Sequence, residues 1–191
     1  CHKPLQIDSA NPAAMEAGLC ACNGRPVLNS VTGEDAKLSV ILPLAKKYGA
    51  VVVGLTMDEA GLPDTAERRL EIARKIVERA EAFGLRRRDV VIDCLSLPVA
   101  VYPDQAAETL KAVALVKREL GVRTMLGISN ISFGMPNRER INAAFLTMAI
   151  AAGLDLPILN PESGQVTDAL DAALLLCGAE QGMLRFLRRD E

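Results

Sequence analysis

Residues 51–84 read VVVGLTMDEAGLPDTAERRLEIARKIVERAEAFG, and this stretch decides the fold class. It opens with an apolar run that has no alternating polar positions, as is typical of a parallel strand covered on both faces. Asp64 and Glu67 have the spacing of a helix cap and its reciprocal partner, and Gly84 ends the pattern. Apolar residues between them recur at helical spacing: Leu70, Ala73, Val77 and Ala80. The stretch therefore predicts one strand followed by one helix over 64–83.

The same alternation of strand and helix occurs six times along the chain. The predicted strands are short apolar runs at residues 4–8, 26–31, 51–56, 90–95, 124–129 and 156–160. The predicted helices follow them at residues 12–22, 34–48, 64–83, 105–120, 138–152 and 167–189. No linker or low-complexity segment interrupts the series, so we expect a single domain over residues 1–191. Consecutive βα units fit either a doubly wound sheet or a βα barrel.

Composition excludes several classes of function. The formal net charge is −2 and aromatic residues make up 3% of the chain, so we expect no nucleic-acid partner. No apolar run reaches the roughly 18 residues that a membrane span needs, and residues 1–4 do not begin a signal peptide. We therefore expect no membrane partner and a cytoplasmic protein.

The cysteines do not form a convincing metal motif. Cys20 and Cys22 could supply half of a zinc site, but such a site usually brings a second cysteine or histidine pair. The single histidine is His2, close to the start of the chain. We expect reduced thiols and no metal ligands in this chain.

Polar residues gather at the carboxyl ends of the predicted strands. They are Asp8, Asn29, Asp93, Asn130 and Asn160. In a parallel barrel all these ends meet at one mouth, where ligands bind, whereas in an open sheet they lie along an edge. Asp8 has a second explanation, because Asp often caps the helix that follows a strand. Asn29 and Asp93 lie among apolar strand residues and need a hydrogen-bonding partner, which is either protein or ligand.

Carboxylates and amides gathered around one mouth suit a flat heterocycle rich in N–H groups, such as a pterin or a guanine-like ring. The sequence contains no GxGxxG and no P-loop, so a phosphate cradle is not indicated. Asp8 and Asp93 could instead be the carboxylate pair of a glycosidase. That alternative lacks the aromatic residues on which sugars usually stack.

Nearly the whole chain resembles the pterin-binding domain of the tetrahydrofolate-linked, corrinoid-dependent methyltransferases. This group includes methyltetrahydrofolate:corrinoid/iron-sulfur protein methyltransferase and the folate module of cobalamin-dependent methionine synthase. The segments that carry the resemblance are PLQIDSANPAAMEAGL, GRPVLNSVTGE, VVVGLTMDEAGLPDTAERRLEIA, VVIDCLSLPV and LGISNISFGMPNRERINAAFLTMAIAAGLDLPILNP. The resemblance implies an α/β fold, a TIM-type (β/α)8 barrel of the dihydropteroate synthase-like class. By this register residues 4–8 are the third strand, so we expect that the first two βα units are missing and that the chain is truncated.

The resemblance also implies roles for five residues. Asp8, Asn29 and Asp93 would bind the pterin ring of tetrahydrofolate or methyltetrahydrofolate. Asn130 would lie near N5, the atom that carries the methyl group, and Arg138 would lie just beyond it, towards the rest of the folate or the incoming corrinoid. Cobalamin would be carried by a separate corrinoid protein, and members of this family often form homodimers.

Alternative functions stay open at this point. Dihydropteroate synthases resemble the chain in fold but carry Arg and Lys where this chain has Asn130 and Ile131. The chain could also bind a pterin without catalysing a reaction. Within the methyltransferase interpretation, the residues do not fix whether tetrahydrofolate gives or receives the methyl group.

Overall fold

A computed structural model describes residues 3–179 and 182–187. The chain divides into two compact units, which are described separately. Unit 1 comprises residues 1–94 and 115–123, and unit 2 comprises residues 95–114 and 124–191. None of the helices in the described ranges has both the length and the apolar character that crossing a membrane requires.

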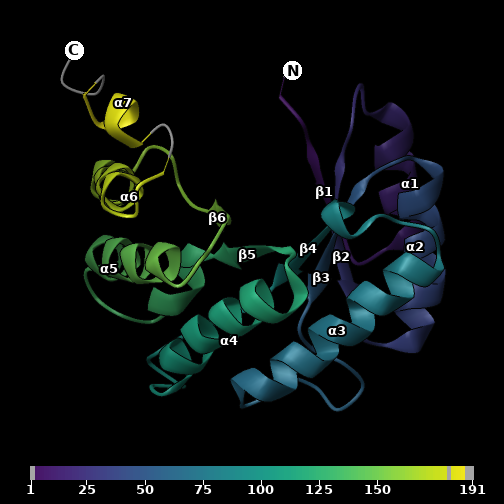
Figure 1. Cartoon of the computed structure of the whole chain (residues 1–191), viewed down its shortest axis with the longest axis horizontal. Coiled ribbons are helices and arrows are strands. Elements are labelled where there is room, and N and C mark those ends of the chain that lie inside the picture. The colour runs from purple at the N-terminus through teal and green to yellow at the C-terminus, as the bar shows by residue number, and fades with distance from the viewer. Residues whose placement is uncertain (1–2, 180–181, 188–191) are drawn as a thin grey trace. The chain divides into compact units, whose positions relative to one another are not determined.

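Unit 1 is a parallel sheet covered by helices. Its strands are β1 (Gln6–Asp8), β2 (Val27–Thr32), β3 (Val51–Leu55) and β4 (Val90–Asp93), and they pair in chain order. The helices α1 (Pro12–Ala21), α2 (Asp35–Lys47) and α3 (Ala66–Ala82) pack against these strands, and η1 (Arg87–Asp89) leads into β4 (Figure 1). The core consists of fully buried aliphatic side chains from both layers, including Leu28, Val52, Ile92, Leu42 and Ile76.

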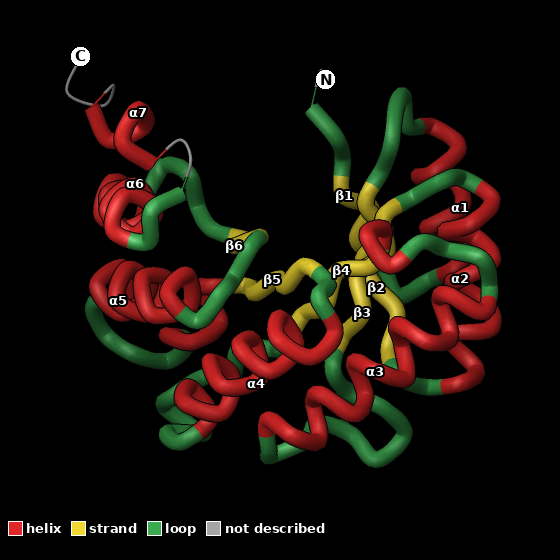
Figure 2. Tube along the Cα trace, viewed as in Figure 1, coloured by secondary structure: helices red, strands yellow, loops and turns green. Residues whose placement is uncertain are grey.

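Unit 2 contains the last strands and most of the remaining helices. Its strands are β5 (Arg123–Gly127), whose first residue belongs to unit 1, and β6 (Leu156–Ile158). Residues 125–127 of β5 pair in parallel with β6. The 3₁₀ turn η2 (Ile128–Ser132) follows β5 directly, and α5 (Arg138–Ala151) then packs against α6 (Gly164–Leu176), which α7 (Gly182–Leu187) also contacts (Figure 2). The first residues of α4 (Gln105–Leu120) belong to unit 2 and the rest to unit 1.

The structure confirms the α/β class and the six predicted βα units. Two details of the predicted helices are wrong. The N-cap of α3 is Thr65, whose hydroxyl accepts from Arg68 N at 3.3 Å, and not Asp64. The helix predicted at 167–189 begins three residues earlier and stops at Leu176, because Gly178 takes a left-handed conformation with φ of 68°. Residues 182–187 of the predicted helix form a separate helix, α7. Residues 188–189 of the predicted helix lie outside the described ranges.

Candidate functional site

The carboxyl ends of β1 and β2 join two of the predicted site residues. Asp8 lies opposite Asn29 in the register of the two strands. The buried Asn29 donates from Nδ2 to Asp8 Oδ2 at 3.1 Å. The partner predicted for Asn29 is thus protein, and the contact fixes the exposed Asp8 carboxylate.

Asp8 does not cap the helix that follows it. Asn11 performs that role, accepting at Oδ1 from Ala13 N at 2.9 Å and from Ala14 N at 3.3 Å. Among the described residues no group bonds Asp8 Oδ1. The Asp8 carboxylate can therefore accept a hydrogen bond from solvent or a ligand.

Asp93, the last residue of β4, lies on the same face of the unit 1 sheet as Asp8 and Asn29. Asn29 is in register with Val53, and Asp93 with Leu55. Val53 and Leu55 are two residues apart on β3, and side chains at that spacing point to the same face. The sheet register therefore gathers three predicted site residues on one face of unit 1.

The backbone around Asp93 is held by hydrogen bonds to two consecutive carbonyls. The Asp93 carbonyl accepts from Thr56 N at 3.1 Å and from Thr56 Oγ1 at 3.2 Å. The next carbonyl, of Cys94, accepts from Arg69 Nη1 at 3.0 Å. Burial raises the pKa of the Cys94 thiol, and the charge of Asp93 raises it further while that of Arg69 lowers it. This strand end is therefore rigid, and its thiol is protonated at neutral pH.

Arg69 is a site-supporting residue that sequence reasoning missed. It lies on α3, is completely buried, and also donates from Nε to the Pro63 carbonyl at 3.3 Å. A buried guanidinium that bonds the loops after β3 and β4 ties the two strand ends together. Arg69 lies three and four residues before Ile72 and Ala73, so the helical spacing already placed it on the buried face of α3. The sequence analysis did not use this spacing, because a charged residue in a helix usually faces solvent.

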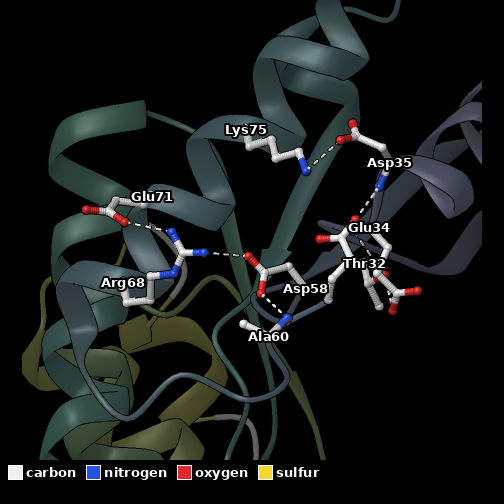
Figure 3. A network of polar contacts seen from close by, with 9 residues as sticks. Thr32, Glu34, Asp35, Asp58, Ala60, Arg68, Glu71 and Lys75 are labelled. Atoms are coloured by element: carbon white, nitrogen blue, oxygen red, sulfur yellow. Dashed lines mark hydrogen bonds and ion pairs between the residues drawn. The ribbon is translucent and has the colours of Figure 1, made fainter.

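A second polar network braces the loop that follows β3 (Figure 3). Asp58 Oδ2 pairs with Arg68 Nη2 at 2.7 Å, and Asp58 Oδ1 accepts from Ala60 N at 3.1 Å. Arg68 Nη1 also pairs with Glu71 at 2.8 Å. The same view shows Lys75, whose Nζ lies 3.1 Å from Asp35 at the start of α2. The contacts of Asp58 and Arg68 hold the loop after β3 against the start of α3, and the pair of Lys75 with Asp35 joins α3 to α2.

Unit 1 has a pocket of about 420 Å³ beside these strand ends. Its polar lining includes Asp8, Ser30 and Thr32, and its apolar lining includes Leu55 and Met57. A mostly apolar pocket with few polar groups is typical of a small-molecule site.

In unit 2, Asn130 lies on the turn η2 and not on a strand. The strand β5 ends at Gly127, and the exposed Asn130 folds back against that end. A Cβ atom at residue 127 would lie 3.0 Å from Asn130 Nδ2, so the glycine leaves room for the amide. The side chain of Asn130 is thus held next to the carboxyl end of β5.

Arg138 binds the same turn from the first residue of α5. Its Nη2 donates to the Ser129 carbonyl at 2.8 Å, and its Nε donates to Ser132 Oγ at 3.0 Å. Its guanidinium also lies 5.9 Å from the centre of the Phe133 ring. Unit 2 thus brings Asn130 and Arg138 together, as unit 1 does for Asp8, Asn29 and Asp93. That all five residues bind one ligand stays a prediction.

The structure also shows the surroundings of Asn160, Cys20 and Cys22. Asn160, two residues after the end of β6, accepts at Oδ1 from Glu162 N at 3.1 Å and so stabilises a turn. Cys20 lies 3.0 Å from the Tyr48 hydroxyl, and Cys22 is a free thiol. Within the described ranges no three His, Cys, Asp or Glu residues come together as metal ligands.

Comparison with known proteins gives a family match and two kinds of curated relative. Residues 1–160 match the family model described as "Pterin binding enzyme". A methylcorrinoid:tetrahydrofolate methyltransferase of Eubacterium limosum is 31% identical, over 93% of this chain and 67% of its own length. A methionine synthase of Mycobacterium leprae is 35% identical over 82% of this chain. The chain spans only 14% of that methionine synthase.

Solved structures agree on the fold. A dihydropteroate synthase of Yersinia pestis with a pterine-sulfa conjugate superposes with a TM-score of 0.68, covering 94% of this chain and 70% of that one, at 14% identity. A dihydropteroate synthase of Xanthomonas albilineans in complex with 7,8-dihydropteroate gives 0.66 at 20% identity, covering 92% and 67%. The six βα units thus have the fold of the dihydropteroate synthase-like TIM barrel, as predicted.

Proposed function

The chain belongs to the family of pterin-binding enzymes, and we propose that it moves a methyl group between N5 of tetrahydrofolate and the cobalt of a corrinoid protein. The observation that carries the proposal is the Asp8 carboxylate, which Asn29 orients on the same sheet face as Asp93. A pterin ring presents an edge of N–H groups, and carboxylates fixed in one direction match such an edge. The name of the Eubacterium limosum relative supports methyl transfer as the reaction.

We assign the pterin ring to Asp8, Asn29 and Asp93. Asp8 would accept from the pterin N–H groups, and Asn29 would hold that carboxylate in place. Arg69 and Thr56 hold the backbone at Asp93 and so limit the movement of its side chain. A site arranged before binding loses less entropy when the ligand arrives.

We assign Asn130 to the methyl-bearing N5. Transfer from N5 to cobalt(I) breaks the N5–carbon bond, whose electron pair stays on nitrogen, and forms a carbon–cobalt bond from the cobalt electron pair. The amine leaves more readily when N5 is protonated, so a group that favours positive charge there lowers the barrier. The Asn130 amide oxygen can accept a hydrogen bond from a protonated N5 and leave the proton on N5. A carboxylate, in contrast, would compete for that proton. Arg138 fixes the turn that carries Asn130.

The cobalt would be carried by a separate corrinoid protein. The corrinoid would supply nucleophilic cobalt when tetrahydrofolate gives the methyl group, and methylated cobalt when tetrahydrofolate receives it. Homodimer formation also stays a prediction from the family resemblance. Dihydropteroate synthesis is less well supported, because Asn130 and Ile131 replace the basic residues expected for an anionic leaving group.

The proposal is tested by binding and transfer measured on the same chain. Calorimetric titration with methyltetrahydrofolate should show binding, and an absorbance assay should show methyl transfer to cob(I)alamin. Binding without transfer would favour a pterin-binding module that is not a catalyst. Absence of binding would contradict the pterin assignment itself.

A further inference from the structure

Unit 1 contains a second pocket, of about 310 Å³, at the amino ends of its strands. Arg25 lies two residues before β2, Ala50 lies directly before β3, and Asp89 lies directly before β4. The rest of the lining includes Lys46 of α2 and the segment 84–86 after α3. The volume is within the range of small-ligand sites, and none of the roles proposed above uses this pocket.

The lining carries more positive than negative charge. Among the described residues that form it are the cations Arg25, Lys46 and Arg86, and a single carboxylate, that of Asp89. Asp89 Oδ2 accepts from Arg86 Nε at 2.7 Å, and Asp89 Oδ1 lies 2.7 Å from Arg25 Nη2. One carboxylate can neutralise only one of the two guanidinium groups beside it, and Lys46 adds a further positive charge.

The ends of two helices offset part of this charge. α2 and α3 both end beside the pocket, and the C-terminus of a helix carries about half of a negative charge. Arg25 Nε donates to the Gly49 carbonyl, which follows α2, at 2.9 Å. Lys46 Nζ donates to the Gly84 carbonyl, which follows α3. Two helix ends cancel about one positive charge, so a surplus of about one remains for a ligand.

The two guanidinium groups also keep unused donors. Asp89 Oδ1 has no hydrogen bond among the described residues, so the N–H groups of Arg25 Nη2 are close to it but not aligned with it. In the described part of the chain, no Nη nitrogen of Arg25 or Arg86 donates a hydrogen bond. A guanidinium presents its N–H groups as a rigid fork that matches the oxygens of a carboxylate or a phosphate. The pocket therefore suits an oxyanion.

The oxyanion must also carry a donor. Asp89 is 4% exposed, and its Oδ1 is a buried acceptor without a hydrogen bond, which costs free energy. Two guanidinium groups and an ammonium can donate to more oxygens than the two of a carboxylate, and a tetrahedral oxyanion supplies more. Inorganic phosphate keeps an O–H group at neutral pH, whereas sulfate has none. Only the phosphate can therefore both accept from the cations and donate to Asp89.

We infer that this pocket binds inorganic phosphate as hydrogen phosphate and selects it over sulfate. The Nη groups of Arg25 and Arg86 and the Lys46 ammonium would donate to the phosphate oxygens, and the phosphate O–H would donate to Asp89 Oδ1. Arg25 now covers that oxygen, but its side chain is 46% exposed and can turn towards the ligand. The inference does not depend on methyl transfer, because the pocket lies at the end of the strands opposite Asp8 and Asp93.

Calorimetric titration with phosphate and with sulfate, at neutral pH and constant ionic strength, tests the inference. We expect the unaltered protein to bind phosphate at least about 10-fold more tightly than sulfate. Arg86→Gln should weaken phosphate binding about 5-fold or more, because it removes a charged fork. Arg86→Lys keeps the charge but loses the fork, so we expect a smaller loss. Asp89→Asn should reduce the preference for phosphate to about 2-fold or less, because an amide N–H can donate to sulfate.

The matched control is Arg88→Gln, which changes the net charge equally at an exposed residue outside the pocket lining. It should leave phosphate binding within about 2-fold of the original. Methyl phosphate separates the two sources of a phosphate group, because above its second pKa of about 6 it has no O–H and should bind as weakly as sulfate.

Three results would overturn the inference. They are equal binding of phosphate and sulfate or no binding of either, methyl phosphate binding as tightly as phosphate, and equal weakening by Arg86→Gln and Arg88→Gln. The last result would mean that net charge alone attracts the anion. None of them bears on the proposed methyl transfer.

Discussion

The polar groups at the carboxyl ends of the unit 1 strands and those beside the first turns of α5 and α6 in unit 2 are satisfied in opposite ways. In unit 1 the protein satisfies them itself: Asn29 bonds Asp8, Thr56 bonds the Asp93 carbonyl, and Arg69 bonds the Cys94 carbonyl. In unit 2 Asn142 and Ser163 are buried without a partner among the described residues. Internal hydrogen bonds fix the direction of a few polar groups, as recognition of a rigid ring requires. Unpaired groups instead stay available to a water molecule or a ligand.

The largest effect should come from removing the buried cation of unit 1. Arg69→Met would leave the carbonyls of Cys94 and Pro63 without a donor, so we expect a loss of about 3 kcal/mol in the free energy of unfolding. Urea denaturation followed by circular dichroism measures it. Arg74→Met is the matched control, because Arg74 is exposed on the same helix. A loss for Arg69→Met no larger than for the control would show that unit 1 does not depend on this bracing.

The next effect concerns catalysis at the turn of unit 2. Asn130→Ala should lower the rate of methyl transfer about 100-fold, because it removes the oxygen that favours charge on N5. Binding of methyltetrahydrofolate should change much less. The measurement is the single-turnover rate of transfer to cob(I)alamin, with the exposed Asn23→Ala as a control. Full activity in Asn130→Ala would make the assigned mechanism wrong.

Asp93→Asn should weaken substrate binding more than it slows methyl transfer, the reverse of Asn130→Ala. The variant keeps the shape of the side chain but loses the charge that accepts from the pterin N–H groups, so we expect methyltetrahydrofolate to bind about 10-fold more weakly. The transfer rate at saturating substrate should stay within a few-fold of the original. A variant that binds normally but transfers slowly would reverse the roles assigned to Asp93 and Asn130.

The sequence predicted those features of the two units that depend on local pattern. All six parallel strands are short apolar runs in the sequence and were found, although only β2 to β5 are mostly buried. Glycines such as Gly84 and Gly121, both with positive φ, ended helices where expected. Arg69 was missed because burial of a charge depends on carbonyls that are distant in sequence. The contact between Asn29 and Asp8 likewise depends on strand register, which a single sequence leaves open.

A smaller, pH-dependent effect is expected at the amino ends of the unit 1 strands. Buried Asp89 forms ion pairs with Arg86 and Arg25, each at 2.7 Å. Burial alone would raise the pKa of Asp89, but the contacts with Arg86 and Arg25 outweigh it and lower the pKa. A carboxyl whose pKa is lower in the folded state stabilises the protein above its unfolded pKa, and this stabilisation disappears as the pH falls through the folded pKa.

Asp89→Asn should therefore cost about 1 kcal/mol of unfolding free energy at pH 7. The difference from the unaltered protein should shrink as the pH falls below about 3.9, the ordinary pKa of Asp. Denaturation curves across this range measure it, with the exposed Asp104→Asn as the comparison. A difference that is constant with pH would mean that the charge of Asp89 does not contribute.

The smallest effect distinguishes the units most directly, through two helix caps. Thr65 in unit 1 accepts a capping bond from Arg68 N, so Thr65→Ala should cost about 1 kcal/mol of unfolding free energy. Ser163 in unit 2 makes no such bond, so Ser163→Ala should change that free energy by less than about 0.5 kcal/mol. Urea denaturation of both variants without ligand measures the contrast. Equal losses would mean that the Ser163 hydroxyl serves the helix, whereas a loss confined to Thr65→Ala leaves Ser163 available to a ligand.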